Sequence, residues 1–182
     1  MVDLALLQSV SYIAGALGVC VAAIYYVMTL RSQQINMKAN LETRQAQLLM
    51  GIHQILVKPE MMAAGLKLQS IEMKNVNDWN QLCKDEEKYK AWTLWAAFYQ
   101  GIGTLVKEKM IDVGLPAQMY GGNLLWFWEK YRDMNMDCRE KLSWPGWGVE
   151  TEFLYNSILE YGRLHPELGL SHAGRKLTVE TE

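Results

Sequence analysis

The sequence has little of what a disulfide-bonded or nucleic-acid-binding protein needs. It holds three cysteines, an odd number with no CxxC spacing, so we expect no disulfide framework and a reducing compartment. Lys and Arg number 18 against 20 Asp and Glu, which gives a formal net charge of −2. Binding to a phosphate backbone requires a basic stripe that this chain lacks. We therefore expect no nucleic-acid partner.

Charged side chains are absent between Asp3 and Arg31, and the tract Val10–Leu30 is predominantly apolar. At about 1.5 Å per residue, a helix of this length spans about 30 Å, close to the thickness of a bilayer's hydrocarbon core. The tract and the residues before it contain no Lys or Arg, whereas a cleaved secretory signal needs a basic start and a small-residue cleavage site. The sequence therefore predicts that residues 1–30 form a retained transmembrane segment, with a processed signal as the alternative.

The flanking charges predict the orientation of this segment. Arg31, Lys38 and Arg44 follow it closely, whereas only Asp3 and the terminal amine precede it. Basic residues are retained on the cytoplasmic side of a membrane. We therefore expect a single-pass protein of the cell (plasma or inner) membrane, with its N-terminus outside and its C-terminal domain in the cytoplasm.

Apolar residues recur at helical spacing along most of the remaining chain, and almost no segment alternates with the period of a strand. The predicted fold is all-α, with one N-terminal transmembrane helix that continues into a long juxtamembrane helix and is followed by a small cytoplasmic helical bundle. The predicted divisions are a transmembrane segment (1–30), a juxtamembrane stalk helix (31–57), a cytoplasmic helical domain (58–164) and a flexible tail (165–182).

Start and stop signals divide the cytoplasmic part into helices. Pro59 suits the first turn of a helix, and Gly114 suits the position that caps the end of one. The Pro-Gly pair within Trp144–Gly148 predicts a turn. From these signals we expect helices at 59–71, 85–109, 117–135 and 149–164, with a polar connection at 74–82.

Small residues line one face of the predicted transmembrane helix. They are spaced by three or four positions, and they are Ser11, Ala14, Gly15, Gly18 and Ala22. Such faces let helix backbones approach closely in lipid. This pattern predicts association of the helix with a copy of itself or with the span of another protein, although small residues are also common in such helices for other reasons.

Seven tryptophans all fall in the predicted cytoplasmic domain, where they can form a core or a contact surface. The helix at 85–109 places several aromatic residues on one stripe. We predict a possible aromatic pocket formed by Trp92, Trp95, Tyr99 and Trp128.

Signatures of catalysis, metal binding and cofactor binding are not found in the sequence. His53, His165 and His172 lack the spacing of metal ligands. The carboxylates of Asp85–Glu87 suit the charged first turn of a helix, and Gly101–Gly103 lies within a helical pattern rather than after a strand. We expect no enzyme activity, no metal and no cofactor, and we expect the paired glycines to allow close helix packing.

Several features occur in a characteristic order along the chain. They are a single N-terminal span, Tyr25-Tyr26-Val27 with Leu30-Arg31-x-Gln33, a polar helix with Lys38-Ala39-Asn40 and Arg44, Lys58-Pro59-Glu60, an aromatic helix with Phe98-Tyr99, and an exit at Lys107–Asp112. Over residues 7–161 the chain resembles an uncharacterised family of small prokaryotic, single-span, membrane-anchored helical proteins. The resemblance implies this architecture and transfers no functional residue. The chain departs from the family at Met37-Lys38 and at Gly121–Asn123, where the triplet GGN interrupts a helix that usually runs unbroken.

Two functions fit these patterns. The first is a non-enzymatic, membrane-anchored assembly or accessory subunit, which contacts membrane lipid and forms a homo-oligomer or joins a larger membrane complex. The second is a membrane-tethered sensor or effector that binds a small ligand in the aromatic pocket.

Overall fold

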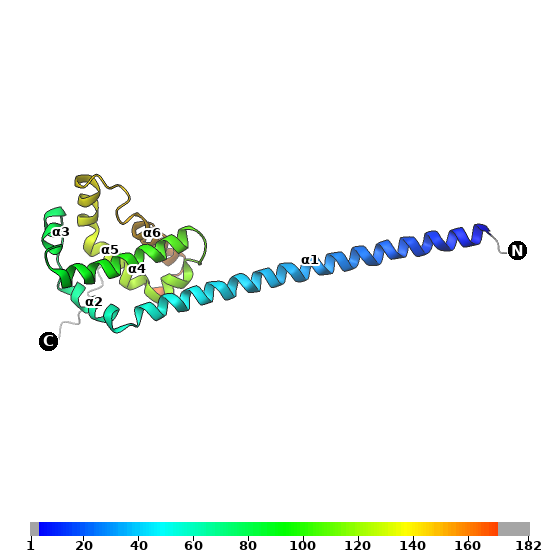
Figure 1. The fold of residues 1–182 in the computed structure, drawn as a ribbon, viewed down its shortest axis with the longest axis horizontal. Coiled ribbons are helices and arrows are strands. Elements are labelled where there is room, and N and C mark those ends of the chain that lie inside the picture. The colour runs from blue at the N-terminus through cyan, green and yellow to red at the C-terminus, as the bar shows by residue number, and fades with distance from the viewer. Residues whose placement is uncertain (1–3, 171–182) are drawn as a thin grey trace. The chain divides into compact units, whose positions relative to one another are not determined.

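A computed structural model describes residues 4–170, apart from the side chains of residues 4–7 and 9. Within this range the chain forms six α-helices, one short 3₁₀ helix and no strand, so the predicted all-α class is confirmed. The elements in Figure 1 are α1 (Leu4–Leu56), α2 (Pro59–Gln69), α3 (Val76–Leu82), α4 (Glu86–Lys107), α5 (Gly114–Lys141), α6 (Val149–Leu164) and η1 (Pro166–Leu168).

The helix α1 runs unbroken for 53 residues and joins the predicted transmembrane segment to the predicted stalk. The chain separates into two compact units, Met1–Ala46 and Gln47–Glu182. The last turns of α1 belong to the second unit and pack apolar side chains against its core, namely Leu48, Leu49, Ile52 and Leu56. The second compact unit therefore includes the last ten residues of the predicted stalk helix (31–57) that lie within α1, because these side chains gain burial there.

The segment between α2 and α4 contains a short helix that was predicted to be a polar connection. The side chain of Asn75 accepts hydrogen bonds from the backbone N–H groups of Asn77 and Asp78, and the Asp78 side chain accepts from the N–H of Asn75. This reciprocal capping satisfies donors that the first turn of a helix leaves unpaired. Burial of Val76 and Leu82 holds the helix against the domain, which the polar composition of the segment did not indicate.

The helix α4 is the centre of the second unit. Its N-terminus is capped by Asp85, which accepts a hydrogen bond from the N–H of Lys88. It packs closely against both α2 and α6, and Figure 1 shows α2 and α4 side by side. A Cβ at Gly103 would overlap the carbonyl oxygen of Glu150 in α6, whereas one at Gly101 would meet no atom within 4 Å. Close packing was therefore predicted correctly for Gly103 and wrongly for Gly101.

The helix α5 is longer than predicted at both ends and runs through the GGN triplet without a break. Gly114 is the first residue of α5 and does not cap the preceding helix. It lies close against Tyr161, since a Cβ at this position would be 2.8 Å from the Tyr161 hydroxyl. Gly121 is equally confined, since its Cβ would lie 2.9 Å from Leu170. Both glycines thus serve close packing of α5 rather than a turn.

The turn at 144–148 forms where predicted and is fixed to α5 by side chains. The indole N–H of Trp147 donates to the Asn135 side-chain oxygen over 2.8 Å, and Asn135 in turn donates to the carbonyl of Tyr131. Gly148 has a φ of +65° and its Cβ would lie 3.2 Å from Asn135, so a side chain is disfavoured there on both counts. These contacts set the direction in which α6 begins.

The predicted flexible tail differs from the structure over its first six residues. Pro166–Leu168 form a 3₁₀ turn, and Leu170 packs against the core of the helical domain, in contact with Gly121 and Gly162. The sequence after His165 is mostly polar, and the contact depends on one apolar side chain, that of Leu170. The composition of the segment therefore did not indicate it. The rest of the predicted tail, residues 171–182, lies outside the described residues.

Candidate functional site

The predicted association face lies along the apolar half of α1. All five of its small residues, Ser11, Ala14, Gly15, Gly18 and Ala22, are exposed. A Cβ added at Gly15 or Gly18 would meet no atom within 4 Å. The face is therefore open to a helix from another chain.

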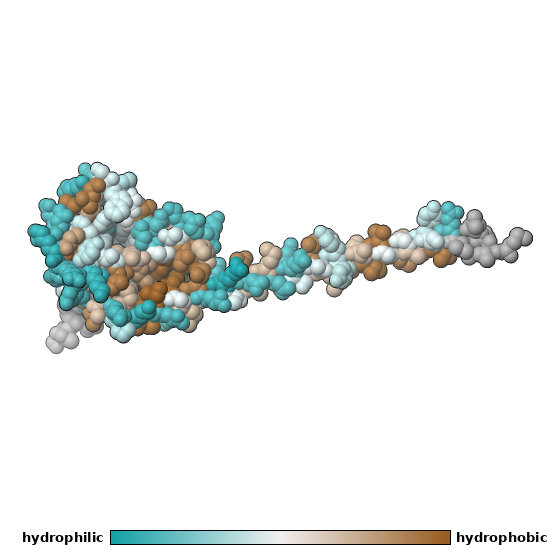
Figure 2. Space-filling model, in the orientation of Figure 1, coloured by the Kyte–Doolittle hydropathy of each residue, from teal (hydrophilic) through white to brown (hydrophobic). Residues whose placement is uncertain are grey.

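The rest of this half of α1 is exposed as well. Of the residues from Val10 to Leu30, only Thr29 is partly covered, and its hydroxyl donates to the Tyr25 carbonyl one turn earlier. Figure 2 shows hydrophobic residues recurring along this part of the helix. By length and composition α1 can cross a membrane, and its most apolar window has a mean hydropathy of 2.0 with none of it buried. No soluble core covers this surface within the described residues.

The four predicted pocket residues do not form one pocket. Trp95 and Tyr99 line an apolar cavity of about 270 Å³ between α2, α4 and α5. Trp92 and Trp128 are buried elsewhere in the domain, with exposed fractions of 6% and 1%. Helical spacing predicts one stripe for Trp92, Trp95 and Tyr99. Trp92, however, lies one turn before Trp95 on α4 and packs against Trp79 and Trp147 instead.

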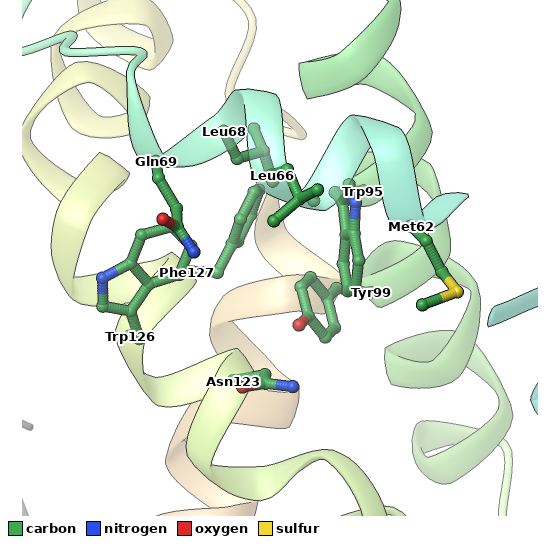
Figure 3. Close-up of a pocket in the computed structure, with 10 residues that line it drawn as sticks. Met62, Leu66, Leu68, Gln69, Trp95, Tyr99, Asn123, Trp126 and Phe127 are labelled. Carbon is green, nitrogen blue, oxygen red and sulfur yellow. The ribbon is translucent and has the colours of Figure 1, made fainter. Parts of the chain in front are cut away.

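The cavity has flat aromatic walls and an aliphatic edge, as Figure 3 shows. Its main apolar lining comes from Leu66, Leu68, Trp95, Tyr99, Trp126 and Phe127. The indole N–H of Trp95 is occupied, because it donates to the carbonyl of Met61 over 3.2 Å. The amides of Gln69 and Asn123 are exposed side chains at the rim.

Tyr99 provides the one deeply buried polar group that faces this cavity. Its side chain is 1% exposed, and burial raises the pKa of its hydroxyl far above the usual value. Figure 3 shows the hydroxyl turned toward the space bounded by Phe127 and Asn123. Among residues 4–170 the Tyr99 side chain makes ring contacts with Trp95, Phe98 and Phe127, and its hydroxyl has no hydrogen-bond partner.

Trp92 belongs to a separate tryptophan cluster, which consists of Trp79, Trp92, Trp144 and Trp147. The ring centroids of Trp79 lie 4.8 Å from Trp92 and 5.0 Å from Trp147, both edge to face. Such arrangements stabilise a core beyond the area they bury. The cluster joins α3, α4 and the turn at 144–148, so it has a structural role.

Trp128 lies beneath this turn in α5. The Arg139 guanidinium is 5.9 Å from its ring centroid, and Arg139 also donates to the Trp147 carbonyl and pairs with Glu152. Trp128 is 1% exposed and borders a different, mostly polar cavity beside Arg132 and Tyr155, separate from the one that Trp95 and Tyr99 line.

The described part of the chain contains no group of three or more His, Cys, Asp and Glu residues placed to hold a metal ion. Burial raises the pKa of the Cys138 thiol to about 11, and the nearby charge of Asp137 adds to this. A thiol in that state is protonated at neutral pH and is a poor nucleophile.

Comparison with protein-family models, curated proteins and solved structures finds no match to this chain. The resemblance to a family of membrane-anchored helical proteins therefore stays a prediction.

Sequence reasoning missed Trp126, Phe127 and Asn123 as residues of the cavity. One feature could have indicated a cavity beside α2. Met62 and Leu66, one turn apart on this helix, are both apolar and are 62% and 72% exposed. The opposite face of this short helix already carries the buried residues Met61, Ala64 and Leu68. A helix with two apolar faces packs on one and offers the other to solvent or a ligand.

Proposed function

We propose that this protein is a non-enzymatic, membrane-anchored assembly or accessory subunit. Its N-terminal helix lies in the cell membrane, associates there through its small-residue face, and holds the helical domain at the membrane surface. The observation that carries the proposal is the open small-residue face on the exposed, uncharged half of α1.

A membrane location for the first half of α1 is supported by the unfavourable free energy of exposing its apolar surface to water. From Val10 to Leu30 nearly every side chain of α1 is exposed, and many are large and apolar, with exposed fractions near 60 to 70%. A continuous apolar surface of this size is unfavourable in water and favourable in lipid. Since all backbone hydrogen bonds of a helix are internal, the segment can enter lipid without unpaired polar groups.

The orientation follows from the charges that border the apolar half. Arg31, Lys38 and Arg44 are exposed on the helix directly after it, and Lys38 lies 4.0 Å from Glu42. Basic residues at this position are retained in the cytoplasm. The helical domain is therefore cytoplasmic and presents its surface to a partner there.

The small-residue face determines which helix α1 associates with in the membrane. Lipid surrounds apolar side chains as readily as another helix does, so packing of small residues rather than burial decides which helices associate. Gly18 lies at the centre of the face, with Ala14 and Ala22 one turn away on either side. A large side chain at position 18 would separate the two backbones.

The proposal is tested with the intact chain in two steps. Membranes prepared without detergent should retain the protein after alkaline washing. In mild detergent, light scattering should then give the mass of an oligomer for the wild type and of a single chain for Gly18→Leu. Val19→Leu is the matched control, because it enlarges an exposed neighbour on another face and should leave the mass unchanged.

Two outcomes count against the proposal. Protein that stays in the supernatant of a detergent-free lysate has no membrane anchor. If Gly18→Leu and the wild type have the same oligomeric mass, the small-residue face is not the site of association.

A further inference from the structure

The cavity between α2, α4 and α5 has a use that the assembly role does not require. Its walls are mostly aromatic, and the hydroxyl of Tyr99, a residue that is 1% exposed, faces the cavity and makes no hydrogen bond within the described chain. A hydrogen-bond donor at the wall of a mostly apolar cavity is available to a bound molecule that offers an acceptor. A ligand that carries such an acceptor can therefore pair with Tyr99.

We propose that this cavity is a binding site for a small neutral molecule, built of one or two fused rings and carrying one oxygen that accepts a hydrogen bond from Tyr99. The flat side chains of Trp95, Trp126 and Phe127 favour ring contacts over contacts with a flexible chain. The exposed side chains of Met62 and Leu66 form an adaptable apolar edge over the ligand.

The size of the cavity sets the size of the molecule. A closed apolar cavity of about 150 Å³ accommodates benzene. The cavity here, of about 270 Å³, therefore has room for two rings and a polar substituent. This volume is slightly below the range of about 300 to 1,000 Å³ typical of small-molecule sites, so a drug-sized ligand would extend into solvent.

The charges around the cavity favour a neutral ligand. No Asp, Glu, Lys or Arg is among its lining residues. The Lys130 ammonium lies 5.3 Å from the Trp126 ring centroid, but it already donates to the carbonyls of Leu68 and Gln69 and pairs with Glu72. A charged ligand would lose its hydration without gaining an ion partner.

The inference is tested on the intact chain in lipid nanodiscs, with empty nanodiscs as the reference for partitioning into lipid. The probes are 2-naphthol, which carries a hydroxyl oxygen, and naphthalene, which does not. Wild-type protein should bind both saturably. Tyr99→Phe should weaken 2-naphthol about fivefold, the typical effect of one hydrogen bond, and leave naphthalene unchanged.

Tyr120→Phe provides a matched control. The Tyr120 hydroxyl is buried without a partner, but Tyr120 does not line the cavity, so this variant should bind both probes as the wild type does. The carboxylate 2-naphthoate should bind at least about tenfold more weakly than 2-naphthol.

Each contrary result overturns a defined part of the inference. Absence of saturable binding by either neutral probe rules out the site. Equal loss of both probes in Tyr99→Phe rules out the hydrogen bond, and equal binding of 2-naphthoate rules out selection for a neutral ligand. None of these results bears on the oligomeric mass of Gly18→Leu, so the two proposals fail independently.

Discussion

Two adjacent residues of α5, Lys130 and Tyr131, donate hydrogen bonds to carbonyl groups at and just after the C-terminal end of α2. The Tyr131 hydroxyl donates to the carbonyls of Leu68 and Ile71, over 2.9 and 3.2 Å, and the Lys130 ammonium reaches the carbonyls of Leu68 and Gln69. The last carbonyls of a helix have no partner within it, and a positive charge there also interacts favourably with the helix dipole. These two residues therefore fix one wall of the cavity on which the ligand proposal depends.

Asp137 connects α5 to α3 in a similar way. One carboxylate oxygen accepts from the backbone N–H of Val76 over 2.7 Å, and the other pairs with Lys141 over 2.8 Å. The bond from Lys141, followed by that from the Val76 amide, holds the pKa of this carboxyl below its ordinary value. The ionised form is thus favoured in the folded chain.

This lowered pKa predicts acid sensitivity. The stabilisation is present at neutral pH and is lost as the pH falls below about 4, the ordinary carboxyl value, toward the lower folded-state pKa. Urea unfolding of the detergent-solubilised chain, followed by tryptophan fluorescence, should show a smaller loss of stability between about pH 5 and pH 3 for Asp137→Asn than for the wild type.

The control for this experiment is Asp133→Asn, which removes an exposed carboxyl from the same helix and makes the same change in net charge. An identical pH dependence for Asp137→Asn and the wild type would show that Asp137 does not contribute.

At the scale of elements, contact between α4 and α6 determines how the second unit packs. Lys107 pairs with Glu150 over 2.9 Å, and the absence of a side chain at Gly103 lets the α6 backbone approach α4. A glycine inside a helix costs some backbone entropy, which here is offset by the close approach.

The two glycines of α4 provide a matched pair for mutation. Gly103→Ala should lower the free energy of unfolding by about 3 kcal/mol, because its Cβ would overlap the Glu150 carbonyl and force the helices apart. Gly101→Ala should raise it by about 0.5 to 1 kcal/mol, because the site is open and alanine favours the helix.

Urea unfolding followed by tryptophan fluorescence measures both effects, since every tryptophan lies between Trp79 and Trp147. Equal stability of the two variants would contradict the close contact between α4 and α6.

At the scale of the whole molecule, the chain consists of two compact units with different solvent requirements. In the first, Met1–Ala46, the apolar side chains of residues 10–46 are nearly all exposed, whereas the second, Gln47–Glu182, encloses a continuous apolar core. A core of this kind is stable without a membrane. The second unit should therefore fold when it is separated from the first.

A truncated chain of residues 47–182 should remain in the supernatant and keep its helical circular dichroism. A chain of residues 58–182 lacks the half-buried Leu48, Leu49, Ile52 and Leu56 and should be less stable by roughly 2 to 4 kcal/mol. Equal urea midpoints for the two truncated chains would show that these four side chains do not stabilise the domain. They would support a domain boundary at residue 58.

The sequence by itself determined the features that depend on local pattern. The uncharged tract before Arg31, the Asp85 cap, and the apolar spacing of residues 149–164 predict helices at the observed positions, because each depends on residues within a few turns. The all-α class follows from the same periodicity.

Only the tertiary structure decided which apolar faces meet. It separated Trp92 from Trp95, brought Trp126 and Phe127 of α5 to Tyr99 of α4, and turned the Tyr99 hydroxyl toward the cavity. It also placed the last ten residues of α1 in the second compact unit, where their apolar side chains pack against the core. The physical reason is that burial depends on residues distant in sequence, and spacing along one helix does not specify its neighbours.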